Sequence, residues 1–430
     1  MGLFAKKTEP DTQAVLTGPL PFDQIGTALA ALAGAGESGA IEAVDALLVQ
    51  AALHRASDVH LEPWDEGVSL RFRIDGLLHE VASLPVRHHA RIAGRVKVLA
   101  RMLTYQKDLP QDGRIDPEAS GCGKAVRVST FPTVNGEKLV LRILNPDPNL
   151  FDLDVLGFDA DTTDALRGIV TRPQGAFLLT GPASSGKTTT IYAMIREILG
   201  RRGPSTHVVA IEDPVEYRLG RVSQSEVNSH AGFTYEAALR AALRQDPEVL
   251  VLGEIRDPET ARTAIQAGLT GHLVISTIHS GTAAGVFTRL LDMGVEPYLA
   301  ASSVVGVMAQ RLYRRACPDC AETALPAPRE RLRCGIADGA GTLRAVGCPA
   351  CLGIGYRGRA ALGEVLMVDE ALEGLLLTRP RTQTVHDAAL AAGMVPLFEQ
   401  AARCVRARLT TPEELERLFP APGAGTHREE

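Results

Sequence analysis

Residues 175–188 read Gly-Ala-Phe-Leu-Leu-Thr-Gly-Pro-Ala-Ser-Ser-Gly-Lys-Thr, an apolar run that leads into a glycine-rich turn. From Gly181 to Thr188 the order is glycine, four residues, glycine, lysine and threonine, which is the Walker A pattern. Apolar residues then recur at helical spacing from Ile191 to Ile198. A strand, a tight turn and a helix in this order predict a loop that wraps around phosphate groups.

The residue types of this loop suit a triphosphate. Glycines let backbone N–H groups converge on the phosphates, Lys187 offsets their charge, and the Thr188 hydroxyl can ligate Mg²⁺. A chance glycine-rich turn is the alternative, and the flanking strand and helix patterns disfavour it. The residues expected to contact ATP are Gly181, Pro182, Ala183, Ser184, Ser185, Gly186, Lys187, Thr188 and Thr189.

The chain around the loop alternates strand-like and helix-like patterns. Four apolar runs, separated by helical patterns, are Ala176–Leu179, Val208–Ile211, Val249–Leu252 and Leu273–Ser276. Short, continuously apolar strands of this kind are typical of a parallel sheet covered on both faces. The sequence therefore predicts an α/β P-loop core.

Hydrolysis also needs carboxylates at the ends of neighbouring strands. The run at Val249–Leu252 ends in Gly253 and Glu254, with glycine where a Walker B strand usually has aspartate, and the run at Val208–Ile211 ends in Glu212. We expect Glu254 to act near Mg²⁺ and Glu212 to polarise the attacking water. Ordinary strand-end acids on a solvated loop remain the alternative.

Histidines and arginines near these strands are further candidates. His272 and His279 bracket the Leu273–Thr277 strand, and a lone histidine at a strand end is more often structural than functional. Three arginines are either surface residues or, in an oligomeric ATPase, contacts to the γ-phosphate. They are Arg240, Arg244 and Arg256.

The N-terminal part has a different pattern. Two pairs of alternating segments flank the turn signals Asp75-Gly76 and Asn135-Gly136, which predicts two hairpins. A helical pattern at Arg87–Met102 lies between them, so this part is expected to form an α+β domain. The hairpin segments are Val68–Ile74 with Leu77–Ala82, and Ala125–Thr130 with Lys138–Leu144.

Four of the seven cysteines form two C-x₂-C pairs, Cys317 with Cys320 and Cys348 with Cys351. Four thiolates at this spacing suit structural Zn²⁺. Cys334 lies between the pairs and is an alternative ligand. Reduced, unpaired cysteines and an iron–sulfur centre are the other interpretations.

Composition limits the class of protein. The 430 residues are 45% hydrophobic and 22% charged, with a net charge of −6, so the chain as a whole does not attract nucleic acid or anionic lipid. Met1–Pro21 lacks the apolar core of a secretory signal, and Leu299–Ala309 is too short to span a bilayer. We expect a cytoplasmic protein with peripheral membrane contact.

These patterns together predict five segments. They are a flexible tail (1–40), an α+β N-terminal domain (41–148), a P-loop ATPase core (149–315), a tetracysteine zinc module (316–356) and a C-terminal helical region (357–430).

Several blocks in fixed order resemble the ATPase family of type II secretion and type IV pilus assembly. Beside the Walker A loop, they include the sequences around Glu212, Glu254 and the two histidines. The N-terminal blocks are Ala56–Pro63, Arg71–Gly76 and Leu109–Arg114, and the C-terminal ones are Ile211–Tyr217, Leu243–Asp257 and Leu269–His279.

The resemblance implies a RecA-like core joined to the N-terminal domain by a flexible linker, and a hexameric ring that hydrolyses ATP. It implies catalytic roles for Glu212, His272 and His279, and nucleotide contacts for Arg71, Arg73 and Arg114 beside the core arginines. It also implies partners in an inner-membrane platform protein and a membrane docking protein. Secretion and pilus-extension members share a tetracysteine module, which disfavours pilus retraction.

Two departures from the family pattern affect these expectations. Ser184 replaces a glycine of the usual loop, which we expect to restrict its backbone. Only about 40 residues precede the matching region, so a far N-terminal docking domain is expected to be absent or reduced. A nucleotide-gated scaffold with little turnover and a nucleic-acid translocase are the competing functions. The acidic balance and the lack of an aromatic–basic motif disfavour the translocase.

Overall fold

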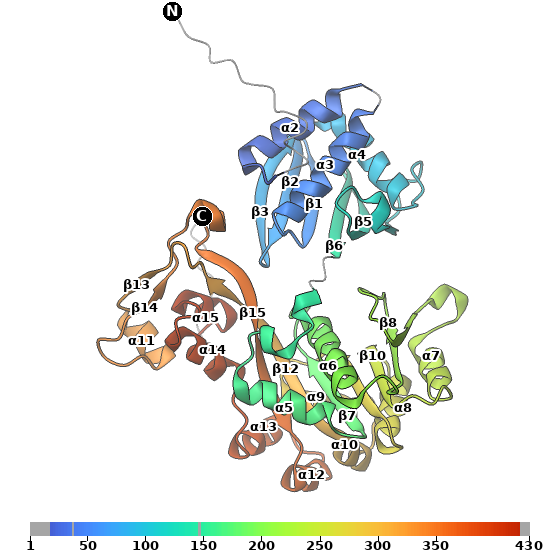
Figure 1. Ribbon diagram of the computed structural model, residues 1–430, viewed down its shortest axis with the longest axis vertical. Coiled ribbons are helices and arrows are strands. Elements are labelled where there is room, and N and C mark those ends of the chain that lie inside the picture. The colour runs from blue at the N-terminus through green and yellow to red at the C-terminus, as the bar shows by residue number, and fades with distance from the viewer. Residues whose placement is uncertain (1–17, 37, 145–147, 422–430) are drawn as a thin grey trace, which may run out of the picture. The chain divides into compact units, whose positions relative to one another are not determined.

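The computed structural model describes residues 18–36, 38–144 and 148–421 (Figure 1). The chain divides after Asn145 into two compact units, each with a large sheet and a buried core of its own. None of the helices in the described ranges combines the length and apolar character that a membrane span requires.

The first unit is a six-stranded antiparallel sheet in the order β3-β2-β1-β6-β5-β4, packed against three helices (Figure 1). Both predicted hairpins and the helix between them are present. The elements are α2 (Phe22–Gly34), α3 (Gly39–Leu53), β1 (Asp58–Trp64), β2 (Gly67–Ile74), β3 (Leu77–Leu84), α4 (Val86–Leu99), β4 (Gln111–Ile115), β5 (Ala125–Thr133) and β6 (Gly136–Leu144).

The flexible tail expected over residues 1–40 is wrong for residues 22–34, which form α2. Ile25, Leu29 and Leu32 are buried, because their spacing puts them on one face of the helix. The short, alanine-rich segment concealed this periodicity. The expectation for residues 1–17 lies outside the described residues.

The second unit carries the apolar runs predicted to form a parallel sheet. Its helices are α5 (Ala160–Val170), α6 (Lys187–Arg202), α7 (Tyr235–Ala242), α8 (Pro258–Leu269), α9 (Ala283–Asp292), α10 (Pro297–Ser303), α11 (Pro328–Cys334), α12 (Glu370–Leu376), α13 (Thr382–Ala391), α14 (Leu397–Arg406) and α15 (Pro412–Leu418). Its strands are β7 (Gly175–Thr180), β8 (Val208–Glu212), β9 (Val222–Glu226), β10 (Val249–Ile255), β11 (Leu273–Ile278), β12 (Val304–Ala316), β13 (Glu322–Ala324), β14 (Thr342–Arg344) and β15 (Tyr356–Met367).

Seven of these strands form one sheet in the order β15-β12-β7-β11-β10-β8-β9. All are parallel except β15, which pairs antiparallel with β12. The four predicted apolar runs are β7, β8, β10 and β11, so the α/β prediction is confirmed. Their carboxyl ends meet at one edge of the sheet, which is where open α/β sheets bind ligands.

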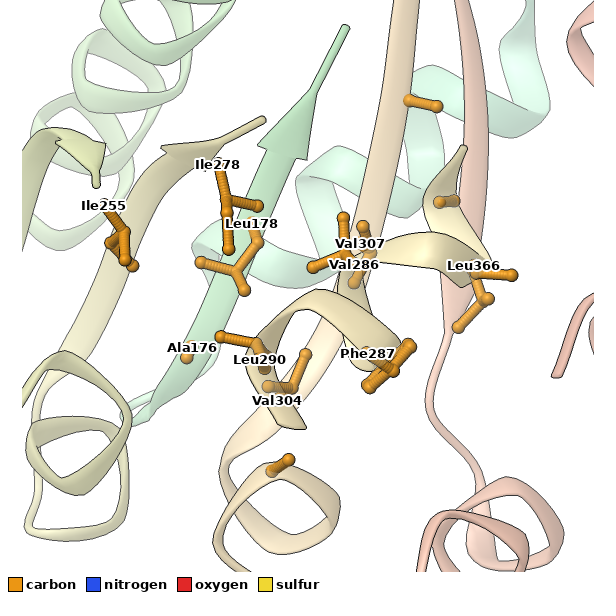
Figure 2. Packing of buried hydrophobic residues seen from close by; sticks show 14 of the residues in the cluster. Ala176, Leu178, Ile255, Ile278, Val286, Phe287, Leu290, Val304, Val307 and Leu366 are labelled. Atoms are coloured by element: carbon orange, nitrogen blue, oxygen red, sulfur yellow. The ribbon is translucent and has the colours of Figure 1, made fainter. Parts of the chain in front are cut away.

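Both faces of this sheet are buried. On one face, Val286, Phe287 and Leu290 of α9 pack near Val304 and Val307 of β12 (Figure 2). The opposite face packs against the helices α5 and α6. Continuous burial on both faces explains why the central strands β7, β8, β10 and β11 have no polar alternation.

The C-terminal region expected to be helical from residue 357 begins instead with β15. This strand pairs with β12 from Gly306 opposite Met367 to Ala316 opposite Tyr356. The core therefore extends past the cysteine segment, and the boundary predicted at residue 315 is too early. The sequence did not reveal this, because residues 317–355 separate β15 from β12, the strand that it pairs with.

Candidate functional site

The Walker A loop connects β7 to α6 at the carboxyl edge of the sheet. Gly181 has φ +145° and Gly186 has φ +88°, backbone conformations that favour glycine. A Cβ at Gly181 would overlap the carbonyl oxygen of Gln310 on β12. The loop therefore needs glycine for its conformation and for its packing against the neighbouring strand.

Lys187 lies at the first position of α6 and points back over the loop. Its Nζ donates hydrogen bonds to the carbonyl oxygens of Gly181 at 2.9 Å and Pro182 at 3.0 Å. Burial lowers the pKa of Lys187, while the negative charge of Glu254 acts in the opposite direction. The ammonium group is thus already at the loop, where it can meet phosphate oxygens.

Ser184 adopts φ +60°, the left-handed conformation that glycine would take at lower cost. For an L-residue this conformation costs about 1–2 kcal/mol. The replacement of glycine by Ser184 therefore introduces strain without changing the path of the loop.

Three of the predicted catalytic residues meet at the carboxyl ends of β10 and β11. Glu254 is held by His279, with Oε1 2.7 Å from Nε2, and by Arg256, whose Nε donates to Oε2 at 2.7 Å. Arg256 also lies 3.7 Å from Asp213. A carboxylate, an imidazole and a guanidinium are thus assembled at the edge of the sheet that carries the phosphate loop.

The structure explains why glycine precedes Glu254. A Cβ at Gly253 would lie 2.7 Å from the Tyr235 hydroxyl and 3.4 Å from Cα of Glu212. An aspartate at this position would displace the Tyr235 hydroxyl, which favours glycine there, and Glu254 is the acid at the end of β10.

Glu212 ends β8, the strand next to β10, and is only 5% exposed. Both of its carboxylate oxygens accept hydrogen bonds, one from the Tyr192 hydroxyl and one from Gln224 Nε2 at 2.8 Å. Burial raises the pKa of Glu212, and these two hydrogen bonds partly offset the effect. The carboxylate is therefore firmly positioned, although it is not freely open to solvent.

His272 is not part of this assembly within one chain, so its catalytic role stays a prediction. It precedes β11 and so lies at the amino edge of the sheet, about 20 Å of strand from the loop. Its Nδ1 is 3.1 Å from the carbonyl oxygen of Ala267, near the end of α8. The two histidines bracket one strand, so only His279 lies at the loop edge.

Arg240 and Arg244 make their described hydrogen bonds and ion pairs outside the cluster of Glu254, His279 and Arg256. Arg240 pairs with Glu236 and Glu259, each at 2.9 Å, and Arg244 donates to the carbonyl oxygen of Arg240 at 2.7 Å. The helix α7 ends at Ala242, so Arg244 lies beyond it rather than on its face. Their predicted nucleotide contacts would need a ligand or a neighbouring subunit.

The three N-terminal arginines lie on the sheet of the first unit. Arg71 pairs with Glu62, and Arg73 lies 3.7 Å from Asp58. Arg114 is on β4, about 19 Å across the sheet from β2. The structure therefore groups Arg71 with Arg73 and places Arg114 apart from them.

The strand register shows two arginines that the sequence analysis missed. Directly opposed residues form a row across five strands: Arg114, Arg127, Arg142, Asp58 and Arg73. Opposed residues share one face of the sheet, so the row is strongly basic. No local signal could have linked these positions, because strand pairing alone brings them together.

The four predicted zinc ligands form a compact cluster. The Sγ atoms of Cys317 and Cys348 are 3.9 Å apart, and Cys351 Sγ lies 3.7 Å from both Cys320 and Cys348. Tetrahedral Zn–S bonds of 2.3 Å space sulfurs by about 3.8 Å, whereas a disulfide needs about 2.05 Å. The cluster thus fits zinc, and all four cysteines are free thiols.

Hydrogen bonds lower the pKa of one of these thiols, which favours the thiolate form that binds a metal. Burial raises the pKa of Cys351, but hydrogen bonds from the N–H groups of Cys348 and Gly355 and from the Cys348 and Cys320 side chains together lower it to about 7. Cys334, the alternative ligand, is buried at the end of α11 and is not a member of the cluster.

Three further residues hold the site and were missed by the sequence analysis: Tyr192, Gln224 and Gln310. Gln310 is 1% exposed on β12 and donates to the Ser185 carbonyl oxygen at 2.9 Å. A glutamine directly after the apolar run at residues 304–309 is a detectable signal, since buried polar side chains need partners.

Comparison with known proteins gives consistent matches along the chain. The model of the family "Type II/IV secretion system protein" matches residues 34–417. The chain is 41% identical over 378 residues to "Type II secretion system protein HxcR" of Pseudomonas aeruginosa, covering 88% of this chain and 77% of the relative. It is 43% identical over 349 residues to "Type II secretion system ATPase E" of Vibrio cholerae, covering 80% and 69%.

A pilus protein and two solved structures extend this list. "Type IV pilus assembly ATPase PilB" of Thermus thermophilus is 38% identical over 383 residues, covering 88% of this chain and 43% of PilB. The crystal structure of the pilus retraction motor PilT with bound ADP has a TM-score of 0.60 at 24% identity, covering 88% and 97%. The ATPase DotB of Yersinia pseudotuberculosis has 0.64 at 20%, covering 87% and 92%. These two structures share the fold.

Proposed function

The chain belongs to the type II/IV secretion system protein family, and we propose that it is a motor ATPase powering type II secretion or the assembly of type IV pilus-like fibres. One observation carries this proposal beyond family membership. The Walker A loop and the cluster of Glu254, His279 and Arg256 lie at the same edge of one parallel sheet.

The loop binds the triphosphate of ATP. Backbone N–H groups at the start of α6 and the helix dipole favour the anion, and the Lys187 ammonium exchanges its carbonyl partners for phosphate oxygens. The Thr188 hydroxyl and the Glu254 carboxylate are the groups that would hold Mg²⁺. The metal would supply charge neutralisation between the phosphates.

Two carboxylates, Glu254 and Glu212, have separate roles in the proposed hydrolysis. Glu254 acts at the metal, and its contacts with His279 and Arg256 keep it in place before ATP binds. Glu212, fixed by Tyr192 and Gln224, orients the attacking water and accepts its proton. Arg256 lies at the same edge of the sheet, and its guanidinium is the group that would meet the charge developing on the γ-phosphate.

The tetracysteine cluster has a structural role in this proposal. Zinc bound by Cys317, Cys320, Cys348 and Cys351 would join the segment after β12 to the segment before β15. A closed four-thiolate site leaves no position for a substrate, so its contribution is to folding.

The proposed oligomeric state, location and partner are taken from the same family. We propose a homohexamer at the cytoplasmic side of the inner membrane, which acts on a platform protein of the secretion or pilus machine. The N-terminal arginines Arg71, Arg73 and Arg114 would meet nucleotide in that assembly, and Arg240, Arg244 and His272 would act across subunits.

The test is steady-state ATP hydrolysis by zinc-loaded full-length protein, with the oligomeric state followed by light scattering. We expect the rate per subunit to rise with assembly and to increase with a cytoplasmic fragment of the platform protein, and we expect DNA to have no effect. Mg-ATP binding without turnover would favour the nucleotide-gated scaffold. Stimulation by DNA would favour the translocase.

A further inference from the structure

Gln310 is the one buried side chain of β12 that bonds directly to the backbone of the phosphate loop among the described contacts. Its amide Nε2 donates to the Ser185 carbonyl oxygen at 2.9 Å, and its Oε1 accepts from the Thr190 hydroxyl at 3.0 Å. Gln310 is 1% exposed and Thr190 is fully buried, so water does not compete for these bonds. The side chain thus joins the loop to the first turns of α6.

The direction of the Ser185 carbonyl determines the direction of the next N–H group. In a planar trans peptide the C=O and N–H bonds point to opposite sides. When Gln310 holds the Ser185 carbonyl toward β12, the Gly186 N–H must point away from β12. A carbonyl turned the other way would place an acceptor, rather than a donor, on the side where phosphate binds.

Gln310 also restricts the space for a side chain at the two glycines of the loop, Gly181 and Gly186. A Cβ at Gly181 would overlap the Gln310 carbonyl oxygen, and a Cβ at Gly186 would lie 2.9 Å from its Nε2. The strand β12 pairs with β7 up to Ala309 opposite Thr180, so Gln310 lies beside the point where the loop leaves the sheet. One residue therefore contacts the beginning and the end of the loop.

External support of this kind matters here because the loop is strained. Ser184 takes a left-handed conformation that serine does not favour, so the sequence of the loop alone does not select its shape. We propose that Gln310 is a positioning residue for the nucleotide phosphates, which fixes the Walker A loop in its phosphate-binding conformation through the Ser185–Gly186 peptide. This inference rests on the proposed ATPase function.

The chain offers a matched control in Gln400 of α14. This buried glutamine also bonds a backbone carbonyl and a threonine hydroxyl, donating to Gly363 O at 2.6 Å and to Thr162 Oγ1 at 3.2 Å. Its partners are Thr162 on α5 and Gly363 on β15, and Gly363 pairs with Gln310 across the sheet, so Gln400 bonds one strand further from the loop and not to the loop itself. Replacing either glutamine removes a comparable set of buried hydrogen bonds.

The experiment compares Gln310→Met and Gln400→Met in zinc-loaded full-length protein. Mg-ATP affinity is measured by competition against a fluorescent ADP analogue, and thermal unfolding is followed in parallel. We expect both variants to lower the melting temperature similarly, whereas only Gln310→Met weakens Mg-ATP binding, by roughly tenfold. Gln310→Glu, which keeps the Thr190 bond but turns a carboxylate toward the Ser185 carbonyl, should weaken binding at least as much.

Equal affinities for Gln310→Met and wild type, or an equal loss in Gln400→Met, would overturn the inference. If Gln310→Met does not fold, Thr190→Val decides the question, because it frees one end of the glutamine amide. That variant should weaken binding by about threefold, and unchanged affinity would contradict the proposal. Failure of the wild type to bind Mg-ATP would instead reject the proposed function.

Discussion

The phosphate loop and the cysteine cluster are both visible as short motifs, yet the fold supports them in different ways. The loop is held without a ligand by residues distant in sequence, such as Gln310, and by strands buried on both faces. Around the cysteines, the local elements β13, β14 and α11 are only three to seven residues long. The difference suggests that the nucleotide site is preformed, whereas the cysteine segment depends on its metal.

The largest effect is expected from removing zinc, which tests whether the cysteine segment depends on its metal. Removing zinc by chelation, or through Cys351→Ser, should unfold the segment 317–355, because structural zinc sites contribute on the order of 10 kcal/mol to folding. Hydrogen exchange should rise in this segment and stay low in β7, β10 and β11. Cys334→Ser, which changes a cysteine outside the cluster, should retain its zinc. Wild-type zinc content in Cys351→Ser would contradict the assigned ligands.

The next prediction concerns the preformed site. Glu254→Gln keeps the shape of the side chain but removes its charge, so kcat should fall by about 100-fold or more. Mg-ATP binding should change only a few-fold. The control is Glu399→Gln, which alters an acid paired with Arg406 on α14 and should leave kcat unchanged. Parental turnover by Glu254→Gln would refute the assigned role.

Tyr192→Phe sharpens the assignment of Glu212. Burial raises the pKa of Glu212 and the Tyr192 hydroxyl lowers it, so loss of the hydroxyl should raise this pKa further. A base is active when ionised, and the fall in kcat on the acid side should therefore begin at a higher pH. Tyr356→Phe, which removes a buried hydroxyl bonded to Thr411, should not move the profile. An unshifted profile in Tyr192→Phe would argue against Glu212 as the base.

The smallest effect is expected at Ser184. Glycine relieves the left-handed strain but gains entropy in the unfolded chain, so Ser184→Gly should stabilise the protein by about 0.5–1 kcal/mol. Arg221→Gly, at another residue with positive φ, should stabilise it similarly. Only Ser184→Gly should tighten Mg-ATP binding. A loss of stability in Ser184→Gly would show that the serine is not strained.

Local patterns in the sequence predicted much of this structure. The Walker A loop and the four parallel strands are each encoded by residues that are close together in the sequence. The two cysteine pairs are likewise recognisable from the short spacing within each pair. These features were therefore readable before any three-dimensional information. The helix α2 was missed because alanines lie on both its buried and its exposed faces, which weakens the contrast around Ile25, Leu29 and Leu32.

Features that depend on strand pairing were not predictable in the same way. The row containing Arg127 and Arg142 arises from register across five strands, and β15 joins the core through β12. His272 is a different case. In a parallel sheet the two ends of one strand lie at opposite edges, so strand direction alone could have separated it from His279.

The most direct measurement of the central claim is the equilibrium affinity of zinc-loaded full-length protein for Mg-ATP, compared with Lys187→Ala. The wild type should bind at submillimolar concentrations, and the variant should bind at least tenfold more weakly, because it loses a charged contact to phosphate. A wild type that does not bind Mg-ATP at millimolar concentrations, or a Lys187→Ala variant with unchanged affinity, would contradict the account.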